Sequence, residues 1–236
     1  MAAAVGQRLT TMGESLPYRL LIFDWDGTLE DSVTAISRSI QRTLTAAGLP
    51  QRPLFVIRDV IGLHFEEGLA QLYPDRNSAE LARMCREQSA ALPVVDDMAL
   101  FEQATEVLEQ LHAEGYWLAI ATGKSRQGLD HALRRYQLDE QFLVTRTADD
   151  ARSKPDPEML FSILDYTGVS AADALMVGDS THDVAMAQAA NIDCVAVSSG
   201  VHSVATLQSI DYALSCLESV RDLLPWLLQR NKRARY

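Results

Sequence analysis

Cysteine is scarce in this sequence: the 236 residues include only 3, at positions 85, 194 and 216. They lie far apart and none belongs to a Cys-x-x-Cys pair. The sequence therefore offers neither a disulfide framework nor the usual spacing of a structural zinc site. We expect three partly buried thiols.

Long apolar runs are absent as well. No stretch reaches the roughly 18 apolar residues that a transmembrane helix needs. The N-terminal segment also lacks the charged-then-apolar pattern of a signal peptide. These absences predict a cytoplasmic protein without a membrane partner. Residues 1–16 are expected to be disordered.

Positive charge is in short supply, because 21 lysines and arginines face 32 aspartates and glutamates, which gives a net charge of −11. An acidic chain repels the phosphates of DNA and RNA, so a nucleic-acid partner is not expected. The basic stretch 230–235 is interpreted as a solvated helix end, where cations complement the helix dipole. The oligomeric state stays open between a monomer and a homodimer.

Apolar runs of strand length are what the sequence does contain. They are continuous rather than alternating, as in parallel strands that are buried on both faces, and they occupy residues 19–24, 116–122, 142–145, 174–179 and 193–198. Helical patterns over 102–115, 156–168 and 183–191 separate the later runs. This alternation predicts an α/β fold with a doubly wound parallel sheet, the Rossmann-like core.

The interval 32–98 breaks the alternation, because it contains no convincing strand. Helical patterns instead cover 33–48, 64–74 and 78–92. We interpret residues 32–98 as a helical cap inserted after the first strand, with crossing points at 31–34 and 92–97. The core domain is then predicted to comprise residues 17–31 and 99–236.

Carboxylates stand at the ends of two of the predicted strands. Asp24 and Asp26 follow the first apolar run, and the alternation of side chains along a strand directs both to the same side. Gly27 permits a tight turn beside them. Asp179 follows the run 174–179, and Asp183 lies one helical turn further on. Ligands of open α/β sheets bind beyond the carboxyl ends of the strands, so these groups are candidates for one site.

Such a site needs a cation. Two like charges about 4 Å apart repel by roughly 4 kcal/mol at an effective dielectric constant near 20. A few hard oxygen ligands suit Mg²⁺, which shares its coordination with water and phosphate. Thr122 and Gly123 offer a hydroxyl and backbone N–H groups, and Lys154 offers an ammonium on a loop stiffened by prolines. Both features fit an anionic substrate.

Four short motifs occur in order at these strand ends: "DWDGT", "ATG", the lysine of "SKPDP", and "GDSTHD". Together they resemble the motifs of the haloacid-dehalogenase-like superfamily, in its branch with a helical cap after the first strand. The phosphoglycolate-phosphatase-like enzymes are the nearest group. The resemblance covers essentially residues 18–225.

The resemblance implies a role for each motif residue. Asp24 would attack phosphorus and form an aspartyl-phosphate, and Asp26 would protonate the leaving oxygen and then activate water. The phosphate-binding residues would be Thr122, Gly123 and Lys154. The metal ligands would be Asp24, Asp26 through its backbone carbonyl, Asp179 and Asp183, the last either directly or through water.

These roles predict a phosphatase that acts on a small phosphorylated metabolite. Dehalogenases lack the second aspartate, so Asp26 favours a phosphatase. A phosphosugar mutase shares the Asp pair and remains an alternative, although the segment after Asp31 lacks the expected cap histidine. Residues 32–98 contain no lysine, which argues against phosphonoacetaldehyde hydrolase chemistry. A non-catalytic phospho-ligand or protein-binding module would need a damaged site, whereas the motifs are intact.

The substrate itself is not specified by the motifs. Phosphoglycolate phosphatases commonly carry Thr-Asn where this chain has Thr122 and Gly123, which puts phosphoglycolate in doubt. In the cap, Arg58 and His64 are possible substrate contacts. Glu30 stands where an apolar residue is more usual, and the sequence gives it no function.

Overall fold

Six parallel strands form one sheet at the centre of the computed structural model, which describes residues 16–89 and 98–233. The strands are β1 (Leu20–Phe23), β2 (Trp117–Ala121), β3 (Val144–Arg146), β4 (Ala174–Gly178), β5 (Asp193–Val197) and β6 (Ser215–Leu217). Their order across the sheet is β3-β2-β1-β4-β5-β6. Five of them correspond to the predicted apolar runs. The sixth was not predicted, because it is short and its three residues are only half-buried.

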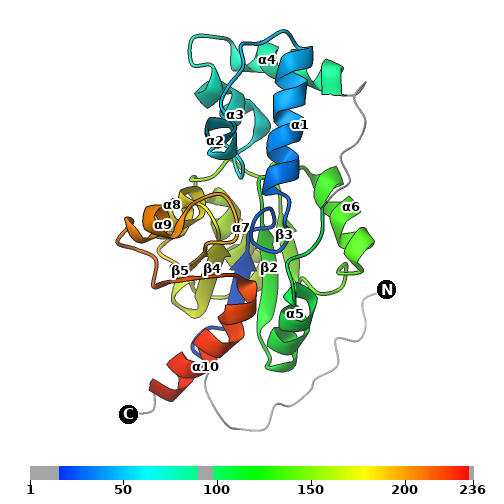
Figure 1. Cartoon of the computed structure of the whole chain (residues 1–236). Coiled ribbons are helices and arrows are strands. Elements are labelled where there is room, and N and C mark those ends of the chain that lie inside the picture. Colours follow the sequence, from blue (N-terminus) through cyan, green and yellow to red (C-terminus); the bar gives the residue numbers. More distant parts are fainter. Residues whose placement is uncertain (1–15, 90–97, 234–236) are drawn as a thin grey trace.

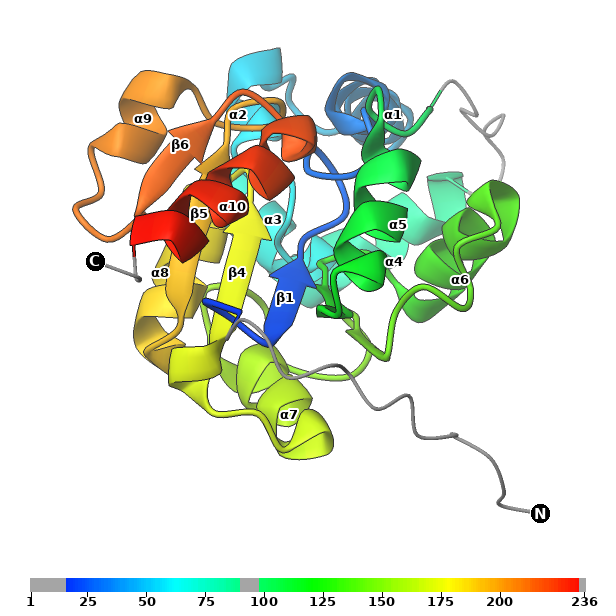
Figure 2. The same cartoon turned by 90° about the horizontal axis from the view of Figure 1, so that it is seen from below.

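Helices cover both faces of this sheet (Figures 1 and 2). One face packs against α5 (Ala104–Ala113), α6 (Arg126–Tyr136) and α10 (Leu223–Arg233), and the other against α7 (Glu158–Thr167) and α8 (Thr181–Ala190). In β1, Leu21 and Phe23 point into the first layer while Leu20 and Ile22 point into the second. The central strands β1, β2 and β4 are buried on both faces and apolar throughout, whereas β3, β5 and β6 include polar residues. The predicted doubly wound α/β fold is confirmed.

The strand order reverses at β1. Strands β2 and β3 extend from it in one direction, and β4, β5 and β6 extend in the other. The short α9 (Val204–Gln208) and the 3-10 turns η1 (Ala171–Asp173) and η2 (Val220–Asp222) complete the connections. In such a sheet a crevice opens beyond the carboxyl ends of the strands at the reversal, which here means the ends of β1 and β4.

Helices α1 (Val33–Ala46), α2 (Leu54–Arg58), α3 (Phe65–Leu72) and α4 (Ser78–Ser89) follow β1 and form what we call the insertion, at the top of Figure 1. The short α2 was not predicted. The insertion has an apolar cluster of its own: Leu44, Leu49, Ile57, Val60, Leu63, Leu69, Leu72, Tyr73, Leu81, Ala82 and Cys85. A second small cluster joins it to the core through Val33, Ile61 and Val201.

The connections between the insertion and the core lie side by side. The backbone N–H of Asp31 donates to the carbonyl of Ala99 at 2.8 Å, and that of Phe101 donates to the carbonyl of Leu29 at 2.9 Å. The first predicted crossing point, 31–34, therefore lies where the chain leaves the core. The second, 92–97, lies outside the described residues, as do residues 1–15 of the segment expected to be disordered.

Two of the three cysteines are more deeply buried than the sequence predicts. Cys85 and Cys194 are buried, Cys216 is half-buried, and none of them forms a disulfide. Among the described residues, no helix combines the length and the apolar character that a membrane span requires.

Candidate active site

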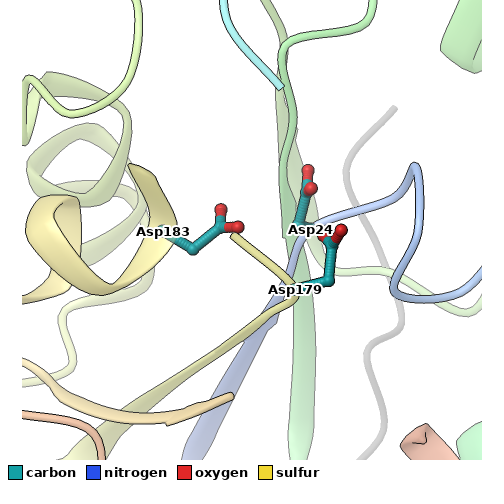
Figure 3. Close-up of side chains that lie close together, drawn as sticks. All are labelled: Asp24, Asp179 and Asp183. Carbon is teal, nitrogen blue, oxygen red and sulfur yellow. The ribbon is translucent and has the colours of Figure 1, made fainter. Parts of the chain in front are cut away.

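Three carboxylates meet at the carboxyl edge of the sheet. Strands β1 and β4 are neighbours, with Phe23 opposite Val177, so the residues that follow them emerge together. Asp24 comes directly after β1 and Asp179 directly after β4, and Asp183 approaches them from the first turn of α8 (Figure 3). One oxygen of each carboxylate lies within 4.8 Å of the others, and all three residues are buried.

Asp183 is aimed by the start of its helix. The Ser180 side chain accepts from the backbone N–H of Asp183, and Asp183 Oδ2 in turn accepts from the Ser180 N–H at 3.1 Å, which completes a capping box. This arrangement occupies Oδ2 and leaves Oδ1 facing the site. A Cβ atom at Gly178 would overlap the Asp183 side chain, so the glycine makes room for it. The helix-cap and metal-ligand interpretations of Asp183 are therefore compatible.

Lys154 supplies the positive charge within this cluster. Its side chain is fully buried, and Nζ lies 2.7 Å from Asp24 Oδ1 and 2.7 Å from Asp183 Oδ1. Burial lowers the pKa of Lys154, but the charges of Asp183 and Asp24 outweigh it, so the pKa ends above its ordinary value. The contact with Asp24 is an ion pair without the alignment of a hydrogen bond. The ammonium stays charged and ties the two carboxylates together.

One ammonium does not balance three carboxylates. Burial raises the pKa of Asp24 to about 7, against the lowering effect of Lys154. Burial, followed by the charges of Asp24 and Asp183, raises the pKa of Asp179 well above its ordinary value. The excess negative charge and the hard oxygen donors fit a divalent cation such as Mg²⁺. Asp24, Asp179 and Asp183 are the side chains that could hold it.

Asp179 is enclosed by backbone on two sides. Thr28 Oγ1 donates to its Oδ1 at 3.1 Å, and the N–H of Val201 donates to its Oδ2 at 2.6 Å. A Cβ atom at Gly27 or at Gly200 would overlap the carboxylate. Gly27, which the sequence assigns to a tight turn, has φ of +82° and also allows this close approach. Gly200 has no comparable signal in the sequence.

Asp26 stands apart from the three-carboxylate cluster. Its Oδ1 accepts from Ser32 Oγ at 2.7 Å and lies 2.8 Å from Lys124 Nζ. The charges of Asp26 and Glu30 outweigh the lowering effect of burial and raise the pKa of Lys124. Two side chains that were not among the predicted site residues, Ser32 and Lys124, thus fix the Asp26 carboxylate. The metal contact predicted for its backbone carbonyl remains a prediction.

Glu30, which received no function from the sequence, is buried behind Lys124. Its carboxylate accepts from Trp25 Nε1 at 3.0 Å and from the Tyr136 hydroxyl at 2.9 Å. Lys124 Nζ lies 3.6 Å from it. Glu30 therefore anchors the ammonium that contacts Asp26. Trp25 itself packs in the core.

Thr122 and Gly123 lie just beyond β2, next to the insertion. Thr122 is buried and its Oγ1 accepts from the backbone N–H of Lys124 at 3.2 Å. A Cβ atom at Gly123 would overlap the carbonyl of Gly62 and come within 3.0 Å of the Leu63 oxygen. Gly123 is thus a direct contact between core and insertion. The phosphate-binding roles of Thr122, Gly123 and Lys154 stay predictions.

The two residues predicted in the cap lie in different places. The Arg58 guanidinium donates to the carbonyl oxygen of Gly200, at the boundary with the core, and it is not part of the cavity described below. The backbone N–H of His64 donates to Ser153 Oγ at 2.9 Å, and its ring lines that cavity. Only His64 is therefore placed where a substrate could touch it. His182 also joins the two parts, through Nε2 and the carbonyl of Asp59 at 3.0 Å.

A cavity of about 230 Å³ separates the insertion from the carboxyl edge of the sheet. Asp26, Gly123 and Lys124 contribute the core side of its wall. The insertion contributes the remainder: Ile36, Ile40, Val60, Ile61, Gly62, Leu63, His64, Phe65, Gly68, Leu69 and Leu72. The cavity therefore opens directly onto one of the two aspartates that follow β1.

Known proteins share this sequence and fold. The sequence profile of the haloacid dehalogenase-like hydrolases matches residues 21–197. The phosphoglycolate phosphatase of Aliivibrio fischeri is 33% identical over 192 residues, which cover 77% of this chain and 85% of that protein. Pyrophosphatase PpaX of Bacillus mycoides is 30% identical over 214 residues, or 89% of this chain and 97% of that one.

A solved structure agrees with these sequence matches. A hydrolase from Pseudomonas syringae superimposes with a TM-score of 0.79 at 27% identity, and the match covers 90% of this chain and 99% of the other. These similarities confirm the resemblance that the four motifs indicate.

Proposed function

The chain belongs to the haloacid dehalogenase-like hydrolases, and from that premise we propose that it is a Mg²⁺-dependent phosphatase of a small phosphorylated metabolite. The reaction proceeds through an aspartyl-phosphate on Asp24. One observation carries the proposal: three buried carboxylates face a single ammonium at the sheet edge, beside a cavity that reaches a fourth carboxylate.

In the first half-reaction a carboxylate oxygen of Asp24 attacks phosphorus, and the bond between phosphorus and the ester oxygen breaks. The charge of Lys154 favours the ionised form of Asp24, against the effect of burial, and neutralises charge on the phosphoryl oxygens. Thr122 and the backbone N–H groups after β2 hold the same oxygens. Asp26 gives a proton to the leaving oxygen, so that an alcohol rather than an alkoxide departs.

In the second half-reaction water attacks the phosphorus of the aspartyl-phosphate. Asp26, now ionised, takes a proton from that water, and the bond from phosphorus to the Asp24 oxygen breaks. Inorganic phosphate leaves and both aspartates return to their starting states. The contacts of Asp26 with Ser32 and Lys124 hold its carboxylate in one orientation for both proton transfers.

Asp24, Asp179 and Asp183 would hold Mg²⁺, with the backbone carbonyl of Asp26 as the further ligand that the family resemblance implies. When bound, the ion neutralises the charge that develops on the transferred phosphoryl group. The capping box keeps Asp183 Oδ1 directed into the site, and Val201 fixes Asp179.

The insertion acts as the cap over this chemistry. It closes the side of the site opposite the sheet and excludes water while the phosphoryl group is transferred. A cavity of about 230 Å³ admits a small metabolite and is too small for a folded protein. The relatives named above are described as a phosphoglycolate phosphatase and a pyrophosphatase, so family membership leaves the leaving group open.

Phosphate release from acetyl phosphate and p-nitrophenyl phosphate, with and without Mg²⁺, tests the proposal. Asp24→Asn should lower kcat by at least about 10⁴-fold, because the nucleophile is lost. The matched control is Asp31→Asn, which removes an exposed carboxylate from the same loop and should leave the rate unchanged.

Two results would overturn the assignment. Full activity in Asp24→Asn would exclude it as the nucleophile, and metal-independent turnover would exclude the Mg²⁺ site. Phosphorus NMR of sugar phosphates checks the alternative, because a mutase would convert isomers without net release of phosphate.

A further inference from the structure

The proposed chemistry accounts for the core side of the cavity but not for the side formed by the insertion. Eight of the lining side chains are aliphatic or aromatic: Ile36, Ile40, Val60, Ile61, Leu63, Phe65, Leu69 and Leu72. They come from α1, α3 and the segment between α2 and α3. Since Asp26 is placed to protonate the leaving oxygen and forms part of the same wall, the leaving group of the substrate must occupy this space.

Among the described residues that line the cavity, no unpaired cation is left for a second anion. Its one ammonium, that of Lys124, lies 2.8 Å from Asp26 and 3.6 Å from Glu30. The other basic group on the wall is His64, whose Nδ1 lies 3.7 Å from the Glu67 carboxylate. Each basic group that lines the cavity thus already faces at least one carboxylate.

The volume sets the size of the leaving group. About 230 Å³ exceeds the roughly 150 Å³ of an engineered apolar cavity that binds benzene. Phe65 lines the cavity and is 38% exposed, so the apolar wall extends to the surface there. A ring with one or two substituents, or a branched chain of similar bulk, matches this space.

We propose that the substrate is the phosphate monoester of an uncharged, mainly apolar alcohol whose carbon skeleton fills this cavity. The inference rests on the proposed phosphatase function and adds the class of leaving group. His64 Nε2 is buried without a hydrogen-bond partner among the described residues, so the wall also has room for one polar substituent.

The same wall excludes small anionic leaving groups. In phosphoglycolate the leaving group carries a carboxylate, and in pyrophosphate it is itself a phosphate. Either would place an unpaired charge against aliphatic side chains, which is costly unless a partner compensates it. Because no unpaired cation occurs among the described lining residues, the proposal predicts a substrate different from those for which the relatives are named.

A homologous series of straight-chain alkyl phosphates tests the proposal on the unaltered enzyme. Acetyl phosphate hydrolysis serves as the measure of phosphatase activity that does not depend on the apolar cavity. Each added methylene should raise kcat/KM about fourfold, which corresponds to about 0.8 kcal/mol of burial. The rise should stop when the cavity is full. Pentyl phosphate should exceed the matching ester of 5-hydroxypentanoate, which ends in a carboxylate, by at least about tenfold.

The possible results distinguish a failure of the apolar leaving group from a failure of the phosphatase function. A series that is flat or falls with chain length, or a preference for phosphoglycolate over the best alkyl ester, would overturn the apolar leaving group while acetyl phosphate hydrolysis upholds the phosphatase. Loss of acetyl phosphate and p-nitrophenyl phosphate hydrolysis would overturn both.

A charge placed on the wall should change the preference. Ile40→Lys adds an ammonium on the insertion side of the cavity, so the ratio of pentyl phosphate to the carboxylate ester should fall by at least about tenfold. Ala46→Lys adds the same charge at an exposed position of the same helix and should leave the ratio unchanged. Acetyl phosphate hydrolysis should be unchanged in Ala46→Lys, and any hydrolysis that Ile40→Lys retains shows that this variant folds. An unchanged ratio in Ile40→Lys would contradict the proposal.

Discussion

The core and the insertion contribute opposite chemistry to one cavity. The core edge carries buried carboxylates close to the ends of β1 and β4, and the ammonium of Lys154 pairs with two of them. The insertion contributes aliphatic and aromatic side chains from helices with their own small apolar cluster. In the proposed function, the reaction takes place at the core edge, and the insertion selects the substrate.

The core side and the insertion side also differ in how far the effects of single substitutions depend on neighbouring residues. Charges such as Lys154, Asp24 and Asp183 form one coupled group, in which removal of a member leaves the others buried and unpaired. The apolar residues of the insertion contribute additively, by the area that each buries. Substitutions on the core side should therefore have large and shared effects, and those on the insertion side smaller and separable ones.

Lys154→Met should have the largest effect. The variant keeps the volume of the side chain but leaves Asp24 and Asp183 without their ammonium. In the metal-free protein the free energy of unfolding should fall by about 3–5 kcal/mol, and phosphate release should drop to the background rate. Urea denaturation and the acetyl phosphate assay measure the two effects.

The control for this variant is Arg152→Met, on the same loop. Arg152 forms exposed ion pairs with Asp156 and Glu158, which are worth about 0–1 kcal/mol. Equal losses of stability in both variants would show that the buried charges are not coupled.

The second largest effect should be the dependence of the stability of the metal-free protein on pH. The pKa of Asp24 is about 7 in the folded chain, against an ordinary value near 3.8. Between these values the folded state binds more protons than the unfolded state, so the metal-free protein should lose stability as the pH rises from about 4 to 7, by up to about 4 kcal/mol. Asp179, whose pKa is also raised, acts in the same direction.

Mg²⁺ should reverse this trend, because it favours the ionised carboxylates and competes with protons. The increase in Tm caused by Mg²⁺ should therefore be larger at pH 8 than at pH 5, and it should shrink in Asp24→Asn. Stability that rises with pH in the metal-free protein would contradict the assignment of Asp24 as a buried, destabilised carboxylate.

Substitutions at Gly123 test the contact between the core and the insertion. A side chain there would overlap the carbonyl of Gly62 and displace the insertion. Gly123→Ala should lower kcat/KM about tenfold and Gly123→Asn about 100-fold, since a misplacement of about 1 Å has effects of that size. The test is steady-state kinetics with the best alkyl ester. If the two variants lost the same activity, or none, displacement of the insertion would not be the reason for a glycine at this position.

The sheet and the meeting of Asp24 with Asp179 could be predicted because their signals are local. Apolar runs of strand length and the carboxylates that end them are adjacent in sequence, and the parallel pairing of β1 with β4 brings Asp24 and Asp179 together. The three residues 215–217 lack that signal because they are half-buried, so β6 was missed.

The supporting contacts could not be predicted, because they join residues that are distant in sequence. Lys124 reaches Asp26 across 98 positions, and Gly200 makes room for Asp179 only after the fold has formed. The helix α1 was predicted from the pattern over 33–48. The division of its apolar side chains, with Ile36 and Ile40 on the cavity and Leu44 inside the insertion, depends on tertiary packing.

Arg58→Met should have the smallest effect, because it removes one contact at the boundary between the two parts. The guanidinium donates to the carbonyl of Gly200, next to the Val201 N–H that fixes Asp179. The residue is largely exposed, so this hydrogen bond contributes about 1 kcal/mol or less to closure.

The expected result for Arg58→Met is a KM raised about threefold with kcat unchanged, because closure improves binding without touching the reacting atoms. Arg38→Met, at an exposed position of α1, is the control and should change neither constant. A kcat that fell by tenfold or more in Arg58→Met would place the arginine with the coupled charges of the core rather than at the edge of the insertion. The assignment of the reaction to the core and of substrate choice to the insertion would then be contradicted.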